Sequence, residues 1–218
     1  MKKHFLKLAA FSLLTYMGVS CSNDKTSNKL PYLGHREAVE KSVDGKTVTD
    51  SIYQKIPAFS LLDQDSTVID NQKMSDKIYV ADFFFTSCPS ICPIMQKQLL
   101  RVYDHFKTEN RLGFISHTID PKRDSIPVLK KYQEKLGVDG NKWHFVFGEK
   151  DTIYQLARNG YMNIAEDDSK APGGIMHSGY FILVDEDGHI RGAYNGTDET
   201  EVNKLIADIP TLLAESKK

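Results

Sequence analysis

The chain has 218 residues, of which 40% are hydrophobic and 26% are charged, and its formal net charge is -1 at pH 7. A chain of this length can bury one sizeable core, so we expect a single domain with extensions. The near-zero net charge argues against nucleic acid as a partner and provides no basic patch for a membrane surface.

The first 20 residues have the pattern of an export signal. Lysines precede an apolar stretch from Leu8 to Val19 that is short for a membrane span. Small residues then lead to Cys21, as in bacterial lipoprotein signals, in which this cysteine is lipidated. Gly18 stands where such signals usually have leucine, so an ordinary secretory signal or an uncleaved anchor are the alternatives. We predict a lipoprotein-type signal peptide at 1–20 and a protein lipid-anchored on the periplasmic side of the inner membrane, in the bacterial cell envelope.

Residues 21–50 are rich in Lys, Ser, Asn, Asp and Thr and show little apolar periodicity. We expect a solvated polar linker here, followed by a domain at 51–218. The domain begins with two short apolar runs, 56–62 and 67–69, joined by the polar residues 63–66. This pattern predicts a β-hairpin.

Strands and helices alternate after this hairpin. Apolar and β-branched runs predict strands at 77–85, 112–119, 143–147, 179–184 and 190–194. Helical spacing predicts helices from Pro93 to about 106, from a cap at Asp124 or Ser125 to Gly137, from 151–152 to about 160, and over 200–213, with a polar loop at 163–176. This order predicts an α/β domain with a thioredoxin-like fold, helices on both faces of the sheet, and an N-terminal β-hairpin extension.

Two cysteines lie where the strand of 77–85 gives way to the next helix. Cys88 and Cys92 are each followed by proline, and Pro93 suits the first position of a helix, which makes Cys92 the expected cap. The unpaired N–H groups and the positive end of the helix dipole favour a thiolate there. In an exported protein with Cys21 lipidated, the two remaining thiols form a disulfide, hold a metal, or alternate between the two.

The spacing of the two cysteines favours a metal over a permanent disulfide. Positions i and i+4 of a helix have Cβ atoms ~5–6 Å apart, whereas a disulfide needs about 3.5–4.5 Å. A bridge therefore requires local distortion, while two sulfurs close on one ion more easily. A permanent disulfide is the alternative, although one closing so short a loop adds little stability.

Asp82 interrupts an otherwise apolar strand, six residues before Cys88. Carboxylates are rarely buried without a partner. Thioredoxins also carry a buried aspartate beneath their redox pair, so we interpret Asp82 as a group that tunes the thiols by hydrogen bonding or proton transfer. The alternative is an aspartate that caps or pairs locally at a sheet edge.

Among the seven histidines, His177 has the most informative position. It follows Pro172-Gly173-Gly174 and directly precedes the strand of 179–184. In thioredoxin-like enzymes this position faces the cysteines and normally carries a cis-proline, which is missing here. An imidazole in its place suits metal ligation better than disulfide exchange, but spacing alone leaves both interpretations open. Two thiolates and one imidazole suit Cu(I) and can hold Cu(II), whereas a structural zinc site needs four protein ligands.

Three stretches together resemble the Sco (SenC/PrrC) family, the copper-binding proteins of cytochrome c oxidase assembly. They are residues 83–93, residues 118–125, and His177-Ser178 before a strand. The resemblance covers roughly residues 52–214 and implies that Cys88, Cys92 and His177 are the copper ligands. The segment 120–124 resembles a family loop near the site, although a turn and helix cap explain it equally well.

The resemblance implies a metallochaperone rather than an enzyme. It would bind copper as Cu(I) or Cu(II) and deliver it to the binuclear site of cytochrome c oxidase subunit II. Expected partners are this subunit, a periplasmic copper donor and a thioredoxin-like reductant. The alternative is a membrane-anchored thiol-disulfide reductase that keeps the subunit's cysteines reduced, with Cys88 and Cys92 as the redox pair and Asp82 as proton acceptor. A peroxiredoxin-like peroxidase fits less well, because those enzymes do not carry a CxxxC with two prolines.

Overall fold

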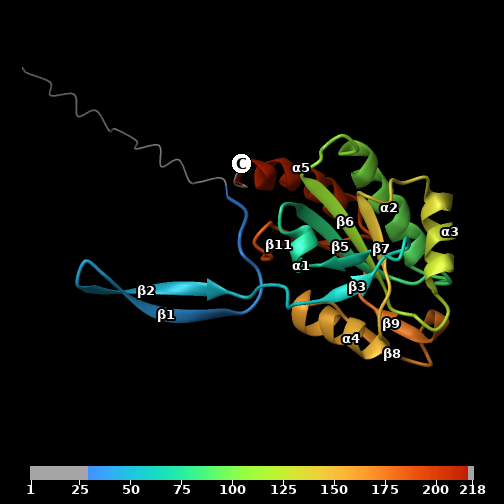
Figure 1. The fold of residues 1–218 in the computed structure, drawn as a ribbon, viewed down its shortest axis with the longest axis horizontal. Coiled ribbons are helices and arrows are strands. Elements are labelled where there is room, and N and C mark those ends of the chain that lie inside the picture. Colours follow the sequence, from blue (N-terminus) through green and yellow to red (C-terminus); the bar gives the residue numbers. More distant parts are fainter. Residues whose placement is uncertain (1–28, 216–218) are drawn as a thin grey trace, which may run out of the picture.

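The computed structural model describes residues 29–215, so the predicted signal peptide and Cys21 lie outside the described residues. A five-stranded sheet with the order β11-β10-β5-β6-β7 forms the centre of the domain (Figure 1). Its strands are β5 (Ile78–Phe84), β6 (Leu112–Thr118), β7 (Trp143–Val146), β10 (Tyr180–Val184) and β11 (Ile190–Asn195). The strands β5, β6 and β7 run parallel, and β10 is antiparallel to both of its neighbours. The α/β, thioredoxin-like fold is confirmed.

Helices cover both faces of this sheet. They are α1 (Asn71–Met74), α2 (Cys92–His105), α3 (Ile126–Leu136), α4 (Lys150–Gln155) and α5 (Glu199–Glu215), and a π-helix, Leu156–Gly160, continues α4. Ser125 is the cap of α3, one of the two predicted, although its side chain makes no cap hydrogen bond, and α3 ends before Gly137 as predicted. The helix predicted from 151–152 instead has Glu149 as its cap and changes to the π-helix at Leu156. No helix among residues 29–215 is long and apolar enough to cross a membrane.

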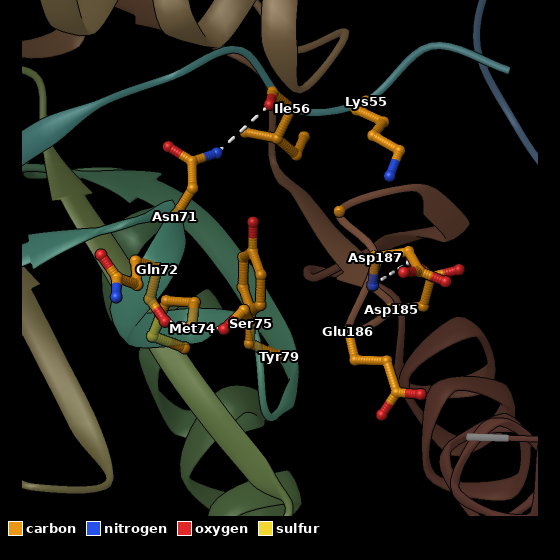
Figure 2. Close-up of a pocket in the computed structure, with 11 residues that line it drawn as sticks. Lys55, Ile56, Asn71, Gln72, Met74, Ser75, Tyr79, Asp185, Glu186 and Asp187 are labelled. Atoms are coloured by element: carbon orange, nitrogen blue, oxygen red, sulfur yellow. Dashed lines mark hydrogen bonds between the residues drawn. The ribbon is translucent and has the colours of Figure 1, made fainter. Parts of the chain in front are cut away.

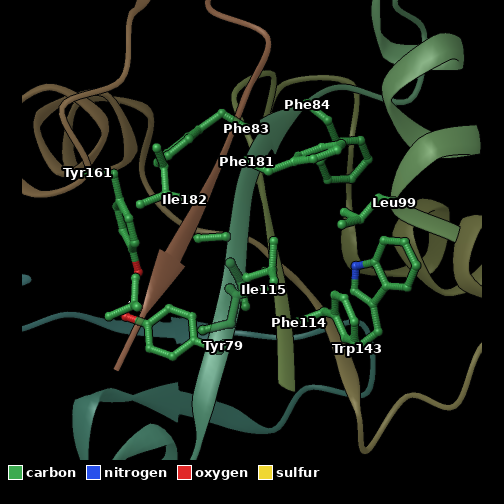
Figure 3. Close-up of a cluster of buried hydrophobic side chains, with 14 of the residues drawn as sticks. Tyr79, Phe83, Phe84, Leu99, Phe114, Ile115, Trp143, Tyr161, Phe181 and Ile182 are labelled. Carbon is green, nitrogen blue, oxygen red and sulfur yellow. The ribbon is translucent and has the colours of Figure 1, made fainter. Parts of the chain in front are cut away.

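Strand β5 is buried along its whole length, as its continuous apolar sequence predicts. Its side chains alternate between the two faces, and Figure 3 shows Phe83 and Phe84 on opposite sides of the strand. Phe84 stacks on Tyr132 of α3, and Phe83 meets Tyr161, just after the π-helix, edge to face. Asp82, the only charged side chain within β5, is therefore enclosed in a strand that core covers on both faces.

Two hairpins precede the central sheet. The predicted one is confirmed as β3 (Ser60–Leu62) paired with β4 (Val68–Asp70). Residues 36–53, which we expected to belong mainly to the polar linker of 21–50, instead form a second hairpin, β1 (Arg36–Val43) and β2 (Lys46–Tyr53). Both strands are mostly exposed, so they lack the strong apolar alternation of a core strand. The turn between them uses Asp44 and Gly45 with positive φ, as tight hairpin turns require.

The hairpin β1–β2, which we call the arm, projects from the domain (Figure 1) and is fixed at its base. Leu33 and Lys55 form bridges to Ile190 and His189, at the start of β11. The ring of Tyr32 stacks on Tyr53 at 4.6 Å between centroids, and the Arg191 guanidinium lies 4.2 Å from the Tyr32 centroid.

The segment 163–176, predicted to be a polar loop, contains a short ribbon. β8 (Ala165–Asp167) pairs antiparallel with β9 (Ile175–His177), and Ala165 lies opposite His177. The side chains of β8 are mostly polar and exposed, so backbone pairing rather than apolar burial defines this strand. The prediction of a loop was wrong for residues 165–167, 175 and 176.

Candidate metal centre

The sheet topology brings distant parts of the chain to one end of the domain. β5 leads to Cys88 at its carboxyl end, and the antiparallel β10 begins at that same end. His177 comes three residues before β10 and is held by the pairing of β9 with β8. Cys88 and His177, 89 residues apart in the sequence, therefore meet.

Three donor atoms converge at this point. Nε2 of His177 lies 3.4 Å from Sγ of Cys92 and 4.0 Å from Sγ of Cys88, and the three donors lie within 4.8 Å of one another. An ion bound at roughly 2.0–2.3 Å from nitrogen and sulfur ligands holds them about 3.5–4 Å apart. The two cysteines are free thiols. The group could therefore hold one metal ion with little movement.

The two thiols are electrostatically unequal. Burial raises the pKa of Cys92, and its hydrogen bond with Cys88 adds to this effect. Burial also opposes ionisation of Cys88, but hydrogen bonds from Cys92 and from the side chain and backbone of Ser90 outweigh it and lower the pKa of Cys88. The expectation of a Cys92 thiolate at a helix cap was wrong, because Ile91 is the cap, Cys92 is the first residue of α2, and burial of its side chain opposes ionisation. Cys88 is the more acidic sulfur.

His177 presents a neutral imidazole to these sulfurs. Burial lowers its pKa, against a smaller opposing effect of the Ser178 backbone, so the ring is uncharged at pH 7 and its Nε2 can donate a lone pair. The ring meets Phe85 edge to face, 5.8 Å between centroids. Phe85 also contacts the turn before β9, where a Cβ added to Gly173 would lie 2.8 Å from its ring. Phe85 thus sets the distance between the turn before β9 and the cysteine loop.

The comparison with known families agrees with this geometry. The model of the SCO1/SenC family matches residues 48–214, which include all three donors. The chain belongs to the SCO1/SenC family.

Individual SCO1/SenC relatives match over most of their length. The SCO1 homologue of Bacillus subtilis is 28% identical over 170 residues, covering 76% of this chain and 86% of that protein. A SCO1/SenC family lipoprotein from Bacillus anthracis superposes with a TM-score of 0.67 at 25% identity, covering 73% of this chain and 95% of that one.

Two further solved structures carry functional descriptions of their own proteins. BsSco, described as having a disulfide switch and as a member of the Sco family of cytochrome c oxidase assembly proteins, has a TM-score of 0.65 at 26% identity, with 73% and 94% of the two chains covered. ScoI of Bradyrhizobium japonicum, solved with copper bound, has a TM-score of 0.61 at 22% identity, with 73% and 99% covered, and this likeness concerns the fold alone.

Asp82 of this SCO1/SenC chain lies beneath the site and is fully buried. It accepts hydrogen bonds from the hydroxyl of Ser116 at 2.5 Å and from Nε2 of Gln96 at 3.4 Å. Burial raises the pKa of Asp82 to about 7, against the lowering effect of Ser116. Because β5 is the central strand, the alternative of a local cap at a sheet edge was wrong. Gln96 also lines the cavity that contains Cys88 and Cys92.

The segment 118–125 supports the cysteine loop through a contact that the sequence did not indicate. Asp124 is fully buried and accepts hydrogen bonds from the Thr86 amide at 3.0 Å, from the Thr86 hydroxyl, and from the Thr118 hydroxyl at 2.7 Å. It therefore fixes the chain two residues before Cys88 instead of capping α3 through its side chain. Asp124 belongs to residues 118–125, one of the stretches that resemble the Sco family, and this resemblance was the sign in the sequence that it lies near the site.

Two cavities lie at opposite ends of the sheet. A cavity of about 310 Å³ opens beside the two cysteines, between α2 and α3, and is lined by Leu100, Tyr132 and two lysines among others. A cavity of about 430 Å³ (Figure 2) lies between Asn71, Tyr79 and the turn 185–188. This second cavity is at the start of β5, so it takes no part in the metal centre.

Proposed function

We propose that this SCO1/SenC protein binds one copper ion through Cys88, Cys92 and His177 and delivers it to the binuclear copper site of cytochrome c oxidase subunit II. The observation that carries the proposal is the convergence of two sulfurs and one imidazole nitrogen within 4.8 Å. Such donors suit Cu(I) and can hold Cu(II). The oxidase-assembly description of BsSco supports the choice of partner.

Copper is the cargo here, so the site has to release it as well as bind it. Three protein ligands leave room for a further ligand, and an incoming thiolate can join the ion before a resident ligand leaves. His177 is partly exposed at the end of the sheet, which gives the partner access. Copper binding releases protons from the thiols. Exchange with a disulfide of a partner protein, which takes up the two electrons, converts Cys88 and Cys92 to a disulfide and so removes both thiolate ligands from the ion.

The location and the remaining partners follow from the same proposal. A lipid on Cys21 would hold the domain at the periplasmic face of the inner membrane, where a copper donor loads it and a thioredoxin-like reductant restores its thiols. The description of the Bacillus anthracis relative as a lipoprotein supports this anchoring.

The second candidate function is thiol-disulfide reduction, and the unequal thiols favour it. The Cys88 thiolate would attack a substrate disulfide, forming a mixed disulfide and releasing one substrate thiolate. Cys92 would then attack Cys88, close the disulfide, and release the second substrate sulfur, while its proton passes to a released thiolate. The substrate gains two electrons and the cysteine pair loses them.

Copper titration of the reduced protein against a Cu(I) chelator tests the proposal. We expect one ion per chain, and at least a tenfold loss of affinity in His177→Ala. The matched control is His105→Ala, on the exposed surface of α2, which should bind as the wild type does. After Cu(II) addition, sulfur-to-copper charge-transfer absorption should disappear in Cys88→Ser and in Cys92→Ser. Unchanged affinity in His177→Ala would remove this residue from the site.

The same histidine variant separates the two functions. If copper delivery is the role, His177→Ala keeps disulfide reductase activity but fails to restore oxidase assembly. Restored assembly by this variant would favour the reductase.

A further inference from the structure

The two faces of the arm differ in composition. Residues directly opposite in an antiparallel pair lie on the same face, and alternate pairs share that face. One face, which we call the arm face, carries the pairs Glu37–Ile52, Val39–Asp50, Lys41–Val48 and Val43–Lys46. Each pair on the arm face therefore combines one apolar side chain with one charge. The opposite face carries mostly Ser, Thr and Ala.

Among residues 29–215, three of the four apolar side chains of the arm face are uncovered, and the fourth, Val39, is half-buried. Val43, Val48 and Ile52 are 52%, 47% and 55% exposed. An isolated two-stranded hairpin is only marginally stable in water, and the arm projects away from the rest of the domain (Figure 1). A projecting hairpin with an exposed apolar face is typical of an interaction surface.

The charges of the arm face change sign from base to tip. Glu37 and Asp50 occupy the two pairs nearest the base, and Lys41 and Lys46 occupy the two pairs nearest the tip. Lys41 and Asp50 form an ion pair at 2.5 Å within the arm, so the charges at the two ends, Glu37 and Lys46, are the ones offered to a partner. A second arm laid antiparallel on this face would place its basic half against the acidic half of the first. In a parallel arrangement, like charges would face each other. The arm face is therefore complementary to itself in one orientation only.

We propose that the arm face is a dimerisation surface, covered by the arm face of a second copy of this chain in antiparallel orientation. A membrane fits less well, since the tip turn contains Asp44 and the arm carries four acidic side chains against three basic ones. The family model begins at residue 48, so β1 and the turn lie outside the residues that this model matches. The proposal does not depend on copper.

The size of the arm predicts a weak dimer. Eight residues per strand give a length of ~26 Å, and two strands about 10 Å of width. Such a face is well below the ~800 Å² per partner of a standard interface. We therefore expect reversible association that depends on protein concentration.

Charge reversal distinguishes a second copy of this chain on the arm face from a membrane or another partner there. Glu37→Lys places a base opposite Lys46 of the second copy and should weaken association at least tenfold. Adding Lys46→Glu should restore it. Within one arm these residues lie at opposite ends, ~20 Å apart, so the rescue cannot occur within one copy. The matched control is Glu40→Lys on the opposite face, which should associate as the wild type does.

Sedimentation equilibrium of the full-length chain, in detergent matched to the density of the solvent, measures this association. The average protein mass should rise with concentration from that of one chain, 24.7 kDa, toward twice that value. A wild-type chain that stays monomeric, or a double variant that associates no better than Glu37→Lys, would overturn the proposal. Arm amides that become protected from hydrogen exchange only with anionic lipid vesicles would overturn it in favour of a membrane.

Discussion

At the scale of single residues, Asp82 shows how burial and charge oppose each other in this protein. Its carboxyl group has two hydrogen-bond donors, the Ser116 hydroxyl and the Gln96 amide, and is otherwise enclosed by core. Neither donor carries a charge, so the ionised form is poorly compensated. The proton on Asp82 is therefore held up to neutral pH, close to the two thiols.

The raised pKa of Asp82 makes the free energy of unfolding depend on pH. The pKa of Asp82 is about 7 in the folded chain and 3.8 as its ordinary value. Between these values the folded chain keeps a proton that the unfolded chain has released, so the free energy of unfolding falls as pH rises from about 4 to 7. Above that range the contribution no longer changes.

We predict that Asp82→Asn removes this dependence. Relative to the reduced wild type, the free energy of unfolding of the variant should increase between pH 5 and pH 7.5 by up to about 3 kcal/mol. Urea unfolding at both pH values measures the difference. The exposed Asp104→Asn on α2 is the control and should show no such change. An identical difference at both pH values for Asp82→Asn would show that this carboxyl is ionised in the fold.

At the scale of elements, the ribbon β8–β9 determines where His177 lies. The turn that precedes β9 contains Gly173 and Gly174, both with φ near +80°. A Cβ on Gly173 would meet Phe85 at 2.8 Å and Pro89 at 3.4 Å, whereas a Cβ on Gly174 would meet no atom within 4 Å. The two neighbouring glycines thus share a backbone conformation but differ in their contact with the cysteine loop.

We predict that Gly173→Ala lowers copper affinity at least tenfold, because it pushes the turn and His177 away from Phe85. Gly174→Ala is the matched control. Both variants should lose roughly 1–2 kcal/mol of stability from the left-handed conformation, but only the first should lose affinity. Chelator competition and urea unfolding provide the two measurements. Equal affinities in the two variants would mean that the turn does not position the imidazole.

Elements that bury apolar side chains could be predicted from the sequence. The strands of the central sheet and the helices α2, α3 and α5 follow apolar periodicity, and the order of these elements placed His177 opposite the cysteines. β8 and the arm could not be predicted this way, because backbone pairing and local turns define them while their side chains stay exposed. Within the site, the depth of Cys92 and the contact of Asp124 with Thr86 depend on packing between elements distant in sequence, which local patterns do not record.

At the scale of the whole molecule, the candidate site joins segments that are separate in the chain. The loop after β5, the first turn of α2 and the strand β9 each supply one donor. These donors come together only when the domain is folded. An ion bound to all three therefore stabilises the native state by mass action.

We predict that Cu(I) stabilises the reduced chain against thermal unfolding and leaves the disulfide-oxidised chain unchanged. At a free copper concentration 100 times the dissociation constant, the gain is about 2.7 kcal/mol. Differential scanning calorimetry under anaerobic conditions measures it. His177→Ala should show a smaller gain at the same copper concentration. A shift of equal size in the oxidised chain would place copper elsewhere on the protein.

The contact of Leu33 with Ile190 also determines how far the two cysteines lie from the point where the N-terminal segment joins the domain. It lies at the end of the sheet where β5 begins, and Cys88 follows the other end of this seven-residue strand. Seven residues of strand span ~23 Å. A tether attached ahead of residue 29 would therefore hold the domain by its rear, and the end of the sheet that carries Cys88 and Cys92 would lie more than 20 Å in front of Leu33.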